Sequence, residues 1–221
     1  MSQKKNASEK MCGLYVVTDE KLSNGLTHSE IARLALEGGA DVIQLRDKEM
    51  EGRKLLGHAL QIRKLTRKTG ALFIVNDRLD IALASKADGI HLGQEDMPVR
   101  AARKLCPKRF IIGVTAHDVA ESVRAEKEGA DYIGLSPIFQ TGSKSDAGTA
   151  CGVAMIRNVK AKVWIPVVAI GGISLSNARE VLDAGADGLA VISAVVSHKD
   201  VTGAARRLKE IISELCSKRR K

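Results

Sequence analysis

The 221-residue sequence predicts an α/β fold, a single (β/α)8 TIM barrel. Three features support this prediction: eight short apolar runs, amphipathic segments between them, and a weak repeat before every second run. Aromatic residues make up only 3% of the chain, so the core must be built from Val, Ile, Leu and Ala. These residues pack well in the layers inside a parallel barrel.

The eight apolar runs are interpreted as strands that are covered on both faces. Each run is short, nearly continuous in apolar character and rich in β-branched residues, which is typical of buried parallel strands. The predicted strands cover residues 13–18, 41–45, 71–75, 89–92, 110–114, 132–135, 165–170 and 188–192.

The segments between these runs predict helices. One helix is expected from about Ser29 to Glu37 and the last one from about Thr202 to Leu215, and apolar residues recur at helical spacing within 55–65 and 178–182. Strands that alternate with helices along the whole chain predict βαβ units and a parallel sheet.

A three-residue repeat stands just before each even-numbered strand. Its first residue, usually glycine, is expected to end a helix in the left-handed conformation. Its last residue is an aspartate at the start of a strand, the end of a barrel that serves stability, so we interpret the aspartates as structural. The four copies are Gly39-Ala40-Asp41, Lys86-Ala87-Asp88, Gly129-Ala130-Asp131 and Gly185-Ala186-Asp187.

The chain is predicted to form one domain over residues 1–221, with 1–11 and 217–221 as flexible tails. No Pro/Gly/Ser-rich linker divides it, and the eight units need all of it. An open doubly wound sheet is the alternative. Such a sheet usually carries a Gly-x-Gly-x-x-Gly turn after its first strand, whereas Thr18-Asp19-Glu20-Lys21 follows here, so the barrel is favoured.

Charge and composition argue against several classes of protein. The net charge of +9 suggests nucleic acid, but aromatic residues for base stacking are absent from the basic runs at the chain ends, so no nucleic-acid partner is expected. The four cysteines are scattered, which argues against zinc and a disulfide framework. No apolar run approaches the roughly 18 residues of a membrane span, and the first ten residues lack a signal-peptide core. We therefore expect a cytoplasmic protein without a membrane partner.

Polar residues stand at the end of the second predicted strand, and active sites of barrels lie at this end of the strands. Because side chains alternate along a strand, Gln44, Arg46 and Lys48 are expected to point together into the mouth of the barrel. An amide and two cations at this place suit an anionic substrate. A salt-bridged strand end is the alternative interpretation.

The third and fourth predicted strands end in carboxylates. Asn76-Asp77 comes directly after the third strand, and the fourth runs into Gly93-Gln94-Glu95-Asp96. Two carboxylates on neighbouring strand ends, with few His or Cys residues nearby, form the oxygen-rich kind of site that binds Mg²⁺ together with substrate phosphate oxygens. Asn-Asp is also a common turn and helix-cap sequence, so the prediction rests on the pair of carboxylates.

The fifth and sixth strands add hydroxyl groups. Thr115 comes directly after the fifth strand, where its hydroxyl is expected to donate to a substrate, and His117 is expected to brace the following helix. The longest loop, residues 136–148, follows the sixth strand and holds Thr141, Ser143 and Lys144. This loop is expected to fold over a phosphate, and a flexible surface loop is the alternative.

Glycine and serine follow the last two strands. Gly171-Gly172 stands after the seventh strand and Ile192-Ser193 after the eighth. Backbone amides at these two places form a phosphate site that recurs in barrels, since glycine lets the backbone approach the anion closely. The sequence therefore predicts an enzyme that handles phosphorylated small molecules with a divalent metal.

Taken together, these residues resemble the thiamine phosphate synthase family from about Gly13 to Leu215. The family motifs Q-x-R-x-K, N-D, G-Q-E-D, G-V-S/T-A-H, T-x-S/T-K, G-G-I and I-S are matched in order. The resemblance implies a Mg²⁺-dependent transferase. It would join 4-amino-2-methyl-5-hydroxymethylpyrimidine diphosphate to 4-methyl-5-(2-hydroxyethyl)thiazole phosphate through a pyrimidine cation, giving thiamine phosphate and pyrophosphate.

The resemblance also implies a role for each site residue. Asp77 and Asp96 would bind Mg²⁺. Arg46, Lys48 and Lys144 would be catalytic, because with the metal they neutralise the leaving diphosphate. The residues implied for the pyrimidine diphosphate are Gln44, Arg46, Lys48, Asn76, Thr115 and Lys144. Those implied for the thiazole phosphate are Thr141, Ser143, Gly172, Ile192 and Ser193.

Three positions depart from the family pattern. Gln140 stands where a proline is usual, Gly142-Ser143 gives a slacker loop, and Thr115 replaces the commoner serine. Because Thr115 and Ser143 retain their hydroxyls, the departures concern loop rigidity and affinity more than the type of reaction.

Three alternatives remain open at this point. A thiazole tautomerase or regulator of the same barrel family has little use for a metal and diphosphate site, so Lys48, Asp77, Asp96 and Lys144 together favour the synthase. A non-catalytic thiazole phosphate or thiamine phosphate binding protein would bind without turnover. A sugar phosphate isomerase would need a general acid/base pair. Barrels of this kind often self-associate, so we allow for a homo-oligomer.

Overall fold

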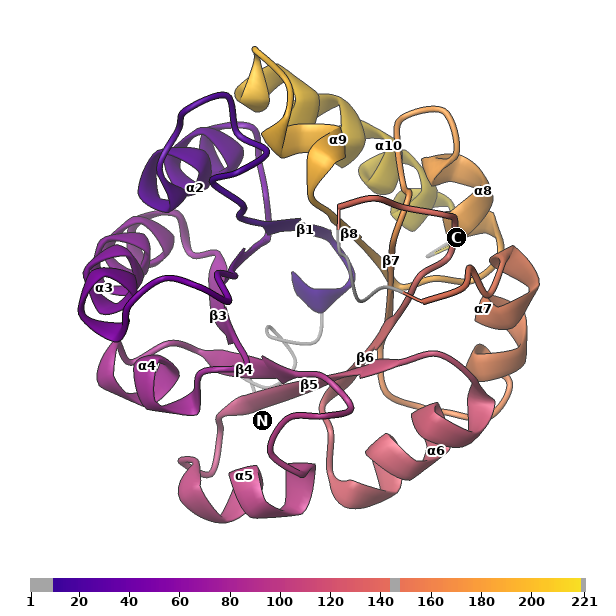
Figure 1. Cartoon of the computed structure of the whole chain (residues 1–221). Coiled ribbons are helices and arrows are strands. Elements are labelled where there is room, and N and C mark those ends of the chain that lie inside the picture. The colour runs from indigo at the N-terminus through magenta and orange to yellow at the C-terminus, as the bar shows by residue number, and fades with distance from the viewer. Residues whose placement is uncertain (1–9, 144–147, 220–221) are drawn as a thin grey trace.

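The computed structural model describes residues 10–143 and 148–219, with 216–219 described by their backbone alone. The described residues form a closed barrel of eight parallel strands in sequential order, surrounded by helices (Figure 1). The predicted α/β barrel is therefore confirmed. The strands are β1 (Leu14–Val17), β2 (Val42–Leu45), β3 (Leu72–Asn76), β4 (Gly89–Leu92), β5 (Ile111–Ala116), β6 (Tyr132–Leu135), β7 (Val167–Ile170) and β8 (Gly188–Val191).

The following helices lie outside the barrel, where they connect successive strands, except that the last two come after the eighth strand (Figure 1). They are α2 (His28–Glu37), α3 (Gly52–Thr69), α4 (Leu79–Ala84), α5 (Val99–Leu105), α6 (Val119–Glu128), α7 (Val153–Lys160), α8 (Ala178–Asp183), α9 (Ser193–Val196) and α10 (Val201–Arg219). Among the described residues, no helix is long and apolar enough to cross a membrane.

Two boundaries differ from the prediction in a way that affects the site. β3 and β5 run on to Asn76 and Ala116, so Asn76 and Thr115 belong to strands. The polar residues at the mouth are therefore held partly by the sheet. At the chain ends, residues 217–219, predicted as part of a tail, continue α10, whereas 1–9 and 220–221 lie outside the described residues.

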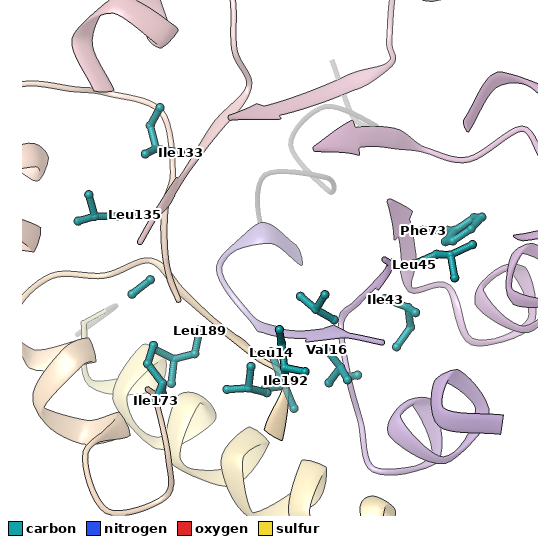
Figure 2. Close-up of a cluster of buried hydrophobic side chains, with 14 of the residues drawn as sticks. Leu14, Val16, Ile43, Leu45, Phe73, Ile133, Leu135, Ile173, Leu189 and Ile192 are labelled. Carbon is teal, nitrogen blue, oxygen red and sulfur yellow. The ribbon is translucent and has the colours of Figure 1, made fainter. Parts of the chain in front are cut away.

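The hydrophobic core has two layers. The larger one lies between the strands and the helices, where side chains such as Leu14, Ile43, Phe73 and Leu189 point outward from the barrel (Figure 2). The smaller one fills the barrel and includes Tyr15, Val42, Leu72, Ile74, Ile111, Tyr132, Val168 and Ala190. The N-terminal segment before β1 adds Met11 to this inner layer.

The four repeat aspartates tie strands to helices. Asp187 accepts the backbone N–H of Val167, at the start of β7, at 2.7 Å and the Lys160 ammonium of α7 at 2.7 Å. Asp41, Asp88 and Asp131 make the same pair of contacts with the starts of β1, β3 and β5 and with basic side chains of α10, α3 and α5. Their structural interpretation agrees with this geometry.

Candidate active site

Two adjoining hollows open at the carboxyl ends of the strands. The wider one, about 270 Å³, is lined by Arg46, Lys48, Asn76, Asp77, Gly93, Gln94, Glu95, Asp96, Thr115, His117 and Ser136. The narrower one is lined by Ser136, Thr141, Ser143, Ile170, Gly171, Gly172, Ile173, Ala190, Val191, Ile192 and Ser193. The structure therefore places most of the predicted residues in one or the other hollow, and Ser136, which the sequence analysis did not single out, lines both.

The two cations of the wider hollow follow β2. The side chain of Arg46 is only 12% exposed, and its Nη1 lies 4.0 Å from Oδ2 of Asp19. Lys48 is exposed at the rim. Gln44 lies deeper, because it belongs to β2, is buried, and has its side chain beside the Tyr15 hydroxyl in the barrel interior. Gln44 was predicted to point into the mouth with Arg46 and Lys48, but its side chain lies in the barrel interior below the mouth.

Asp77 and Asp96 form a carboxylate pair in the same hollow. Burial and the neighbouring Asp96 raise the pKa of Asp77 from 3.8 to about 6, while Lys48 and Arg46 oppose this rise. Asp96 is held in place by the backbone N–H of Gly93, which donates to its Oδ2 at 2.6 Å. The pair is therefore a concentrated negative charge beside two cations.

The two carboxylates fit a divalent cation whose remaining coordination positions are filled by other ligands. Among the described residues there is no group of three or more His, Cys, Asp or Glu side chains that could enclose a metal ion. Mg²⁺ usually takes one or two carboxylates and fills its remaining positions with water and substrate phosphate oxygens. A bound cation would also relieve the repulsion that raises the pKa of Asp77.

A chain of hydrogen bonds runs from Thr115 at the mouth into the barrel. The Thr115 hydroxyl lies 2.8 Å from Nε2 of His91, whose Nδ1 lies 2.9 Å from the Tyr132 hydroxyl. Tyr132 in turn pairs with the Tyr15 hydroxyl at 2.6 Å. Burial raises the pKa values of both tyrosines, so both hydroxyls keep their protons at neutral pH. This chain fixes the orientation of the Thr115 hydroxyl.

The narrower hollow has a cradle of backbone after β7. Gly171 and Gly172 have positive φ values of 100° and 63°. A Cβ atom on Gly172 would lie 2.7 Å from Cβ of Phe139, so this position accepts only glycine without a shift. Asn177 donates from Nδ2 to the Gly172 carbonyl at 2.9 Å and holds the turn.

Hydroxyl groups line the same hollow. Ser143, in the loop after β6, donates to the hydroxyl of Ser193 at 3.2 Å, at the start of α9. Lys144, predicted to be catalytic, lies outside the described residues. His117 contacts Glu121 of α6 through its backbone N–H and Nδ1, both at 2.9 Å, which agrees with the bracing role expected for it.

The fold and the mouth define the class of (β/α)8-barrel enzymes, whose active sites lie at the carboxyl ends of the strands. A family model described as thiamine monophosphate synthase matches residues 14–195. The chain belongs to the thiamine monophosphate synthase family, so the resemblance and the transferase class predicted from the sequence are confirmed.

Similar proteins match over nearly their whole length. The thiamine-phosphate synthase of Methanocella arvoryzae is 63% identical over 201 residues, which cover 91% of this chain and 95% of the relative. That of Methanoculleus marisnigri is 58% identical over 200 residues, 90% and 95% of the two chains. The solved thiamine phosphate pyrophosphorylase from Pyrococcus furiosus has a TM-score of 0.87 and 45% identity, and the match covers 94% of this chain and 98% of that one.

Proposed function

We propose that the protein condenses a hydroxymethylpyrimidine diphosphate with a thiazole phosphate, giving thiamine phosphate and pyrophosphate. The observation that carries the proposal is the pair of hollows that meet at Ser136. One has cations and a carboxylate pair, and the other has a glycine cradle with hydroxyls. Two anionic substrates held in these hollows would bring their uncharged rings together at the shared wall.

The wider hollow suits the diphosphate ester. Arg46 presents a nearly buried guanidinium, which forms strong paired hydrogen bonds with phosphate oxygens, and Lys48 adds a second charge at the rim. Asn76 is fixed by β3 and offers an uncharged amide. We include Lys144 as a third cation from the family resemblance alone.

Asp77 and Asp96 are the residues that would hold Mg²⁺. The metal, when bound, supplies positive charge to the diphosphate and so makes pyrophosphate a better leaving group. The protein's part in this step is to keep the two carboxylates close and to add the charges of Arg46 and Lys48.

The narrower hollow suits the phosphate of the thiazole substrate. The Gly171-Gly172 turn brings backbone close to the ligand, and the hydroxyls of Thr141, Ser143 and Ser193 line the same space. Ile192 also lines the hollow, while its buried side chain packs in the larger core layer. A thiazole ring bound at this place would lie near Ser136, where the two hollows adjoin.

The reaction needs positioning and charge more than a protein nucleophile. The bond between the pyrimidine methylene carbon and the diphosphate oxygen breaks, and the thiazole nitrogen forms a new bond to that carbon. Pyrophosphate leaves with the bonding electrons. Cations that surround the diphosphate stabilise the negative charge that develops on it. Holding the two substrates side by side makes a bimolecular reaction effectively unimolecular.

We also propose that the chain forms a single domain and that the protein is cytoplasmic, as expected from the sequence.

The test of the proposed reaction is pyrophosphate release from the two substrates, with Mg²⁺ and with EDTA, together with mass measurement of thiamine phosphate. Metal-dependent release with thiamine phosphate as the second product supports the proposal. Binding of thiazole phosphate without release would instead support the tautomerase or binding-protein alternative.

A further inference from the structure

We propose that His28, outside both hollows, is a positioning residue that holds the Arg46-Asp47-Lys48 segment in place for the diphosphate. The inference rests on the proposed function, because only that function gives the segment the role of binding a diphosphate. It concerns a residue that touches no substrate and acts through Thr18 and Asp47.

His28 lies behind the segment and bridges two of its supports. It is the first residue of α2, and its side chain is fully buried. Nδ1 lies 2.7 Å from the Thr18 hydroxyl, and Nε2 lies 3.2 Å from Oδ2 of Asp47. One imidazole ring therefore joins the end of β1 to the turn after β2.

Thr18 supports the beginning of the segment. Its backbone N–H donates to the Gln44 carbonyl at 2.9 Å, which extends the pairing of β1 and β2 by one step. Its hydroxyl oxygen accepts the backbone N–H of Arg46 at 3.4 Å. His28 fixes the rotation of this hydroxyl, so it also fixes the direction in which the oxygen accepts.

Asp47 supports the end of the segment. Its Oδ1 accepts the backbone N–H groups of Glu49 at 2.8 Å and Met50 at 2.7 Å, which closes the turn after Lys48. Although burial opposes ionisation, these bonds and the His28 ring lower the pKa of Asp47. Asp47 is thus a charged anchor, with one oxygen on the turn and the other on His28.

Anchoring the segment in this way positions the two cations on either side of Asp47, Arg46 and Lys48. Their side chains line the wider hollow, whereas Asp47 reaches back to His28. Because the segment has left the sheet at Leu45, these side-chain contacts replace strand pairing as its support. Small displacements of a binding group weaken catalysis strongly, so loosening the segment would weaken diphosphate binding in particular.

His58 provides a matched control in the same cluster. Its ring packs edge-on against His28 at 5.5 Å, its Nδ1 lies 3.0 Å from the Ser29 hydroxyl, and its Nε2 lies 3.6 Å from Glu20. Among the described contacts, its ring nitrogens reach Ser29 and Glu20 and form no hydrogen bond with the segment or with Thr18. Replacing it changes the packing of the cluster without removing the Thr18 or Asp47 contact of His28.

The test compares three substitutions of His28 in the full chain. His28→Leu removes both contacts, His28→Asn places an amide near the position of Nδ1, and His28→Gln places one near that of Nε2. Calorimetric titration with inorganic pyrophosphate and Mg²⁺ measures the diphosphate site directly. We expect about tenfold weaker binding for His28→Leu and intermediate values for the two amides.

Steady-state kinetics supply the second readout. The KM for the pyrimidine diphosphate should rise about tenfold in His28→Leu, while the KM for thiazole phosphate stays within about twofold of the original protein. His58→Asn should leave both values within about twofold. A general loss of structure would move both KM values together, so this split separates positioning from folding.

Two outcomes would overturn the inference: equal pyrophosphate affinity in His28→Leu and the original protein, or parallel changes in both KM values. If His28→Leu does not fold, His28→Gln and Thr18→Val answer the same question. Failure of the proposed function looks different, because the original protein would then release no pyrophosphate from the substrates. The titration still decides the role of His28 in that case.

Discussion

The carboxyl group of Asp77 lies beside that of Asp96 at the ends of the adjacent strands β3 and β4, and together with burial this contact raises the pKa of Asp77 to about 6. Asp77 also has a left-handed backbone, with φ at 59°. Both features oppose stability, since like charges repel and left-handed backbone is unfavourable for most residues. Their presence at the mouth of the barrel is consistent with a pair that serves binding.

Asp77→Asn should therefore stabilise the metal-free protein while abolishing its metal response. Asparagine tolerates the left-handed backbone and removes the charge, so Tm at pH 8 without Mg²⁺ should rise by about 2–4 °C. The gain is modest because solvent screens part of the repulsion. Mg²⁺ should raise the Tm of the original protein but not of the variant, and pyrophosphate release should fall about 100-fold or more.

The pH dependence of this effect has a definite sign. Because the pKa of folded Asp77, about 6, exceeds its ordinary value of 3.8, the folded protein takes up a proton before the unfolded chain does. The destabilisation is complete above about pH 6 and is relieved as the pH falls toward 3.8. The Tm difference between variant and original protein should shrink over that range. A difference that stays constant from pH 8 to pH 5 would contradict this account.

Gly172→Ala should weaken binding of thiazole phosphate. The new Cβ meets Phe139 and the carbonyl of Gln140 at 2.8 Å, and the positive φ is unfavourable for alanine by about 1–2 kcal/mol. The turn must shift, so we expect the KM for thiazole phosphate to rise about tenfold while that for the diphosphate stays within about twofold. Steady-state kinetics with each substrate varied in turn measure this.

Gly57→Ala is the control for that substitution. Gly57 lies inside α3, and a Cβ there meets nothing within 4 Å. Alanine is better than glycine within a helix by about 0.5–1 kcal/mol, so this variant should be more stable, with both KM values unchanged. Equal kinetics in Gly172→Ala and Gly57→Ala would argue against a phosphate cradle at Gly172.

Thr115→Val should separate the contribution of the Thr115 hydroxyl from that of the side-chain shape. Valine fills the same space but removes the hydroxyl that lies 2.8 Å from Nε2 of His91, and losing this hydrogen bond should lower stability by about 1–3 kcal/mol. It should also slow pyrophosphate release, because Thr115 faces the wider hollow. Thr115→Ser keeps the hydroxyl, so near-original activity is expected. Loss of activity in the serine variant would show that the methyl group matters instead.

The barrel was predictable from the sequence because each strand is a continuous apolar run between helices, and the strand ends then indicated most residues of the two hollows. His91 was not predictable in this way. Its partners Tyr132 and Thr115 lie 41 and 24 positions away, and closure of the barrel brings them together. A histidine within an apolar strand was the signal present in the sequence.

His28 and Gln44 illustrate two further limits. Alternation along β2 assigns Gln44 to the inner face but does not say at which depth, and the structure places it beside Tyr15 below the mouth. His28 begins a helix, where a polar residue is unremarkable in sequence. Its contact with Asp47 depends on how α2 meets the turn after β2, which no local pattern specifies.

Asp187→Asn should destabilise the barrel without changing its kinetics. The Asp187 carboxylate accepts both the Val167 N–H and the Lys160 ammonium at the amino end of the strands, away from the two hollows. An amide in its place weakens a charge-assisted contact in a partly buried setting, so the unfolding free energy should fall by about 1–3 kcal/mol.

Lys160→Met is the control. It removes the ion pair but leaves the carboxylate to accept from Val167, so the unfolding free energy should fall by less. Urea unfolding measures both losses, and kcat and both KM values at 25 °C should stay within about twofold. A changed KM in Asp187→Asn would mean that strain at the amino end reaches the mouth, contrary to the separation of stability and binding between the two ends of the barrel.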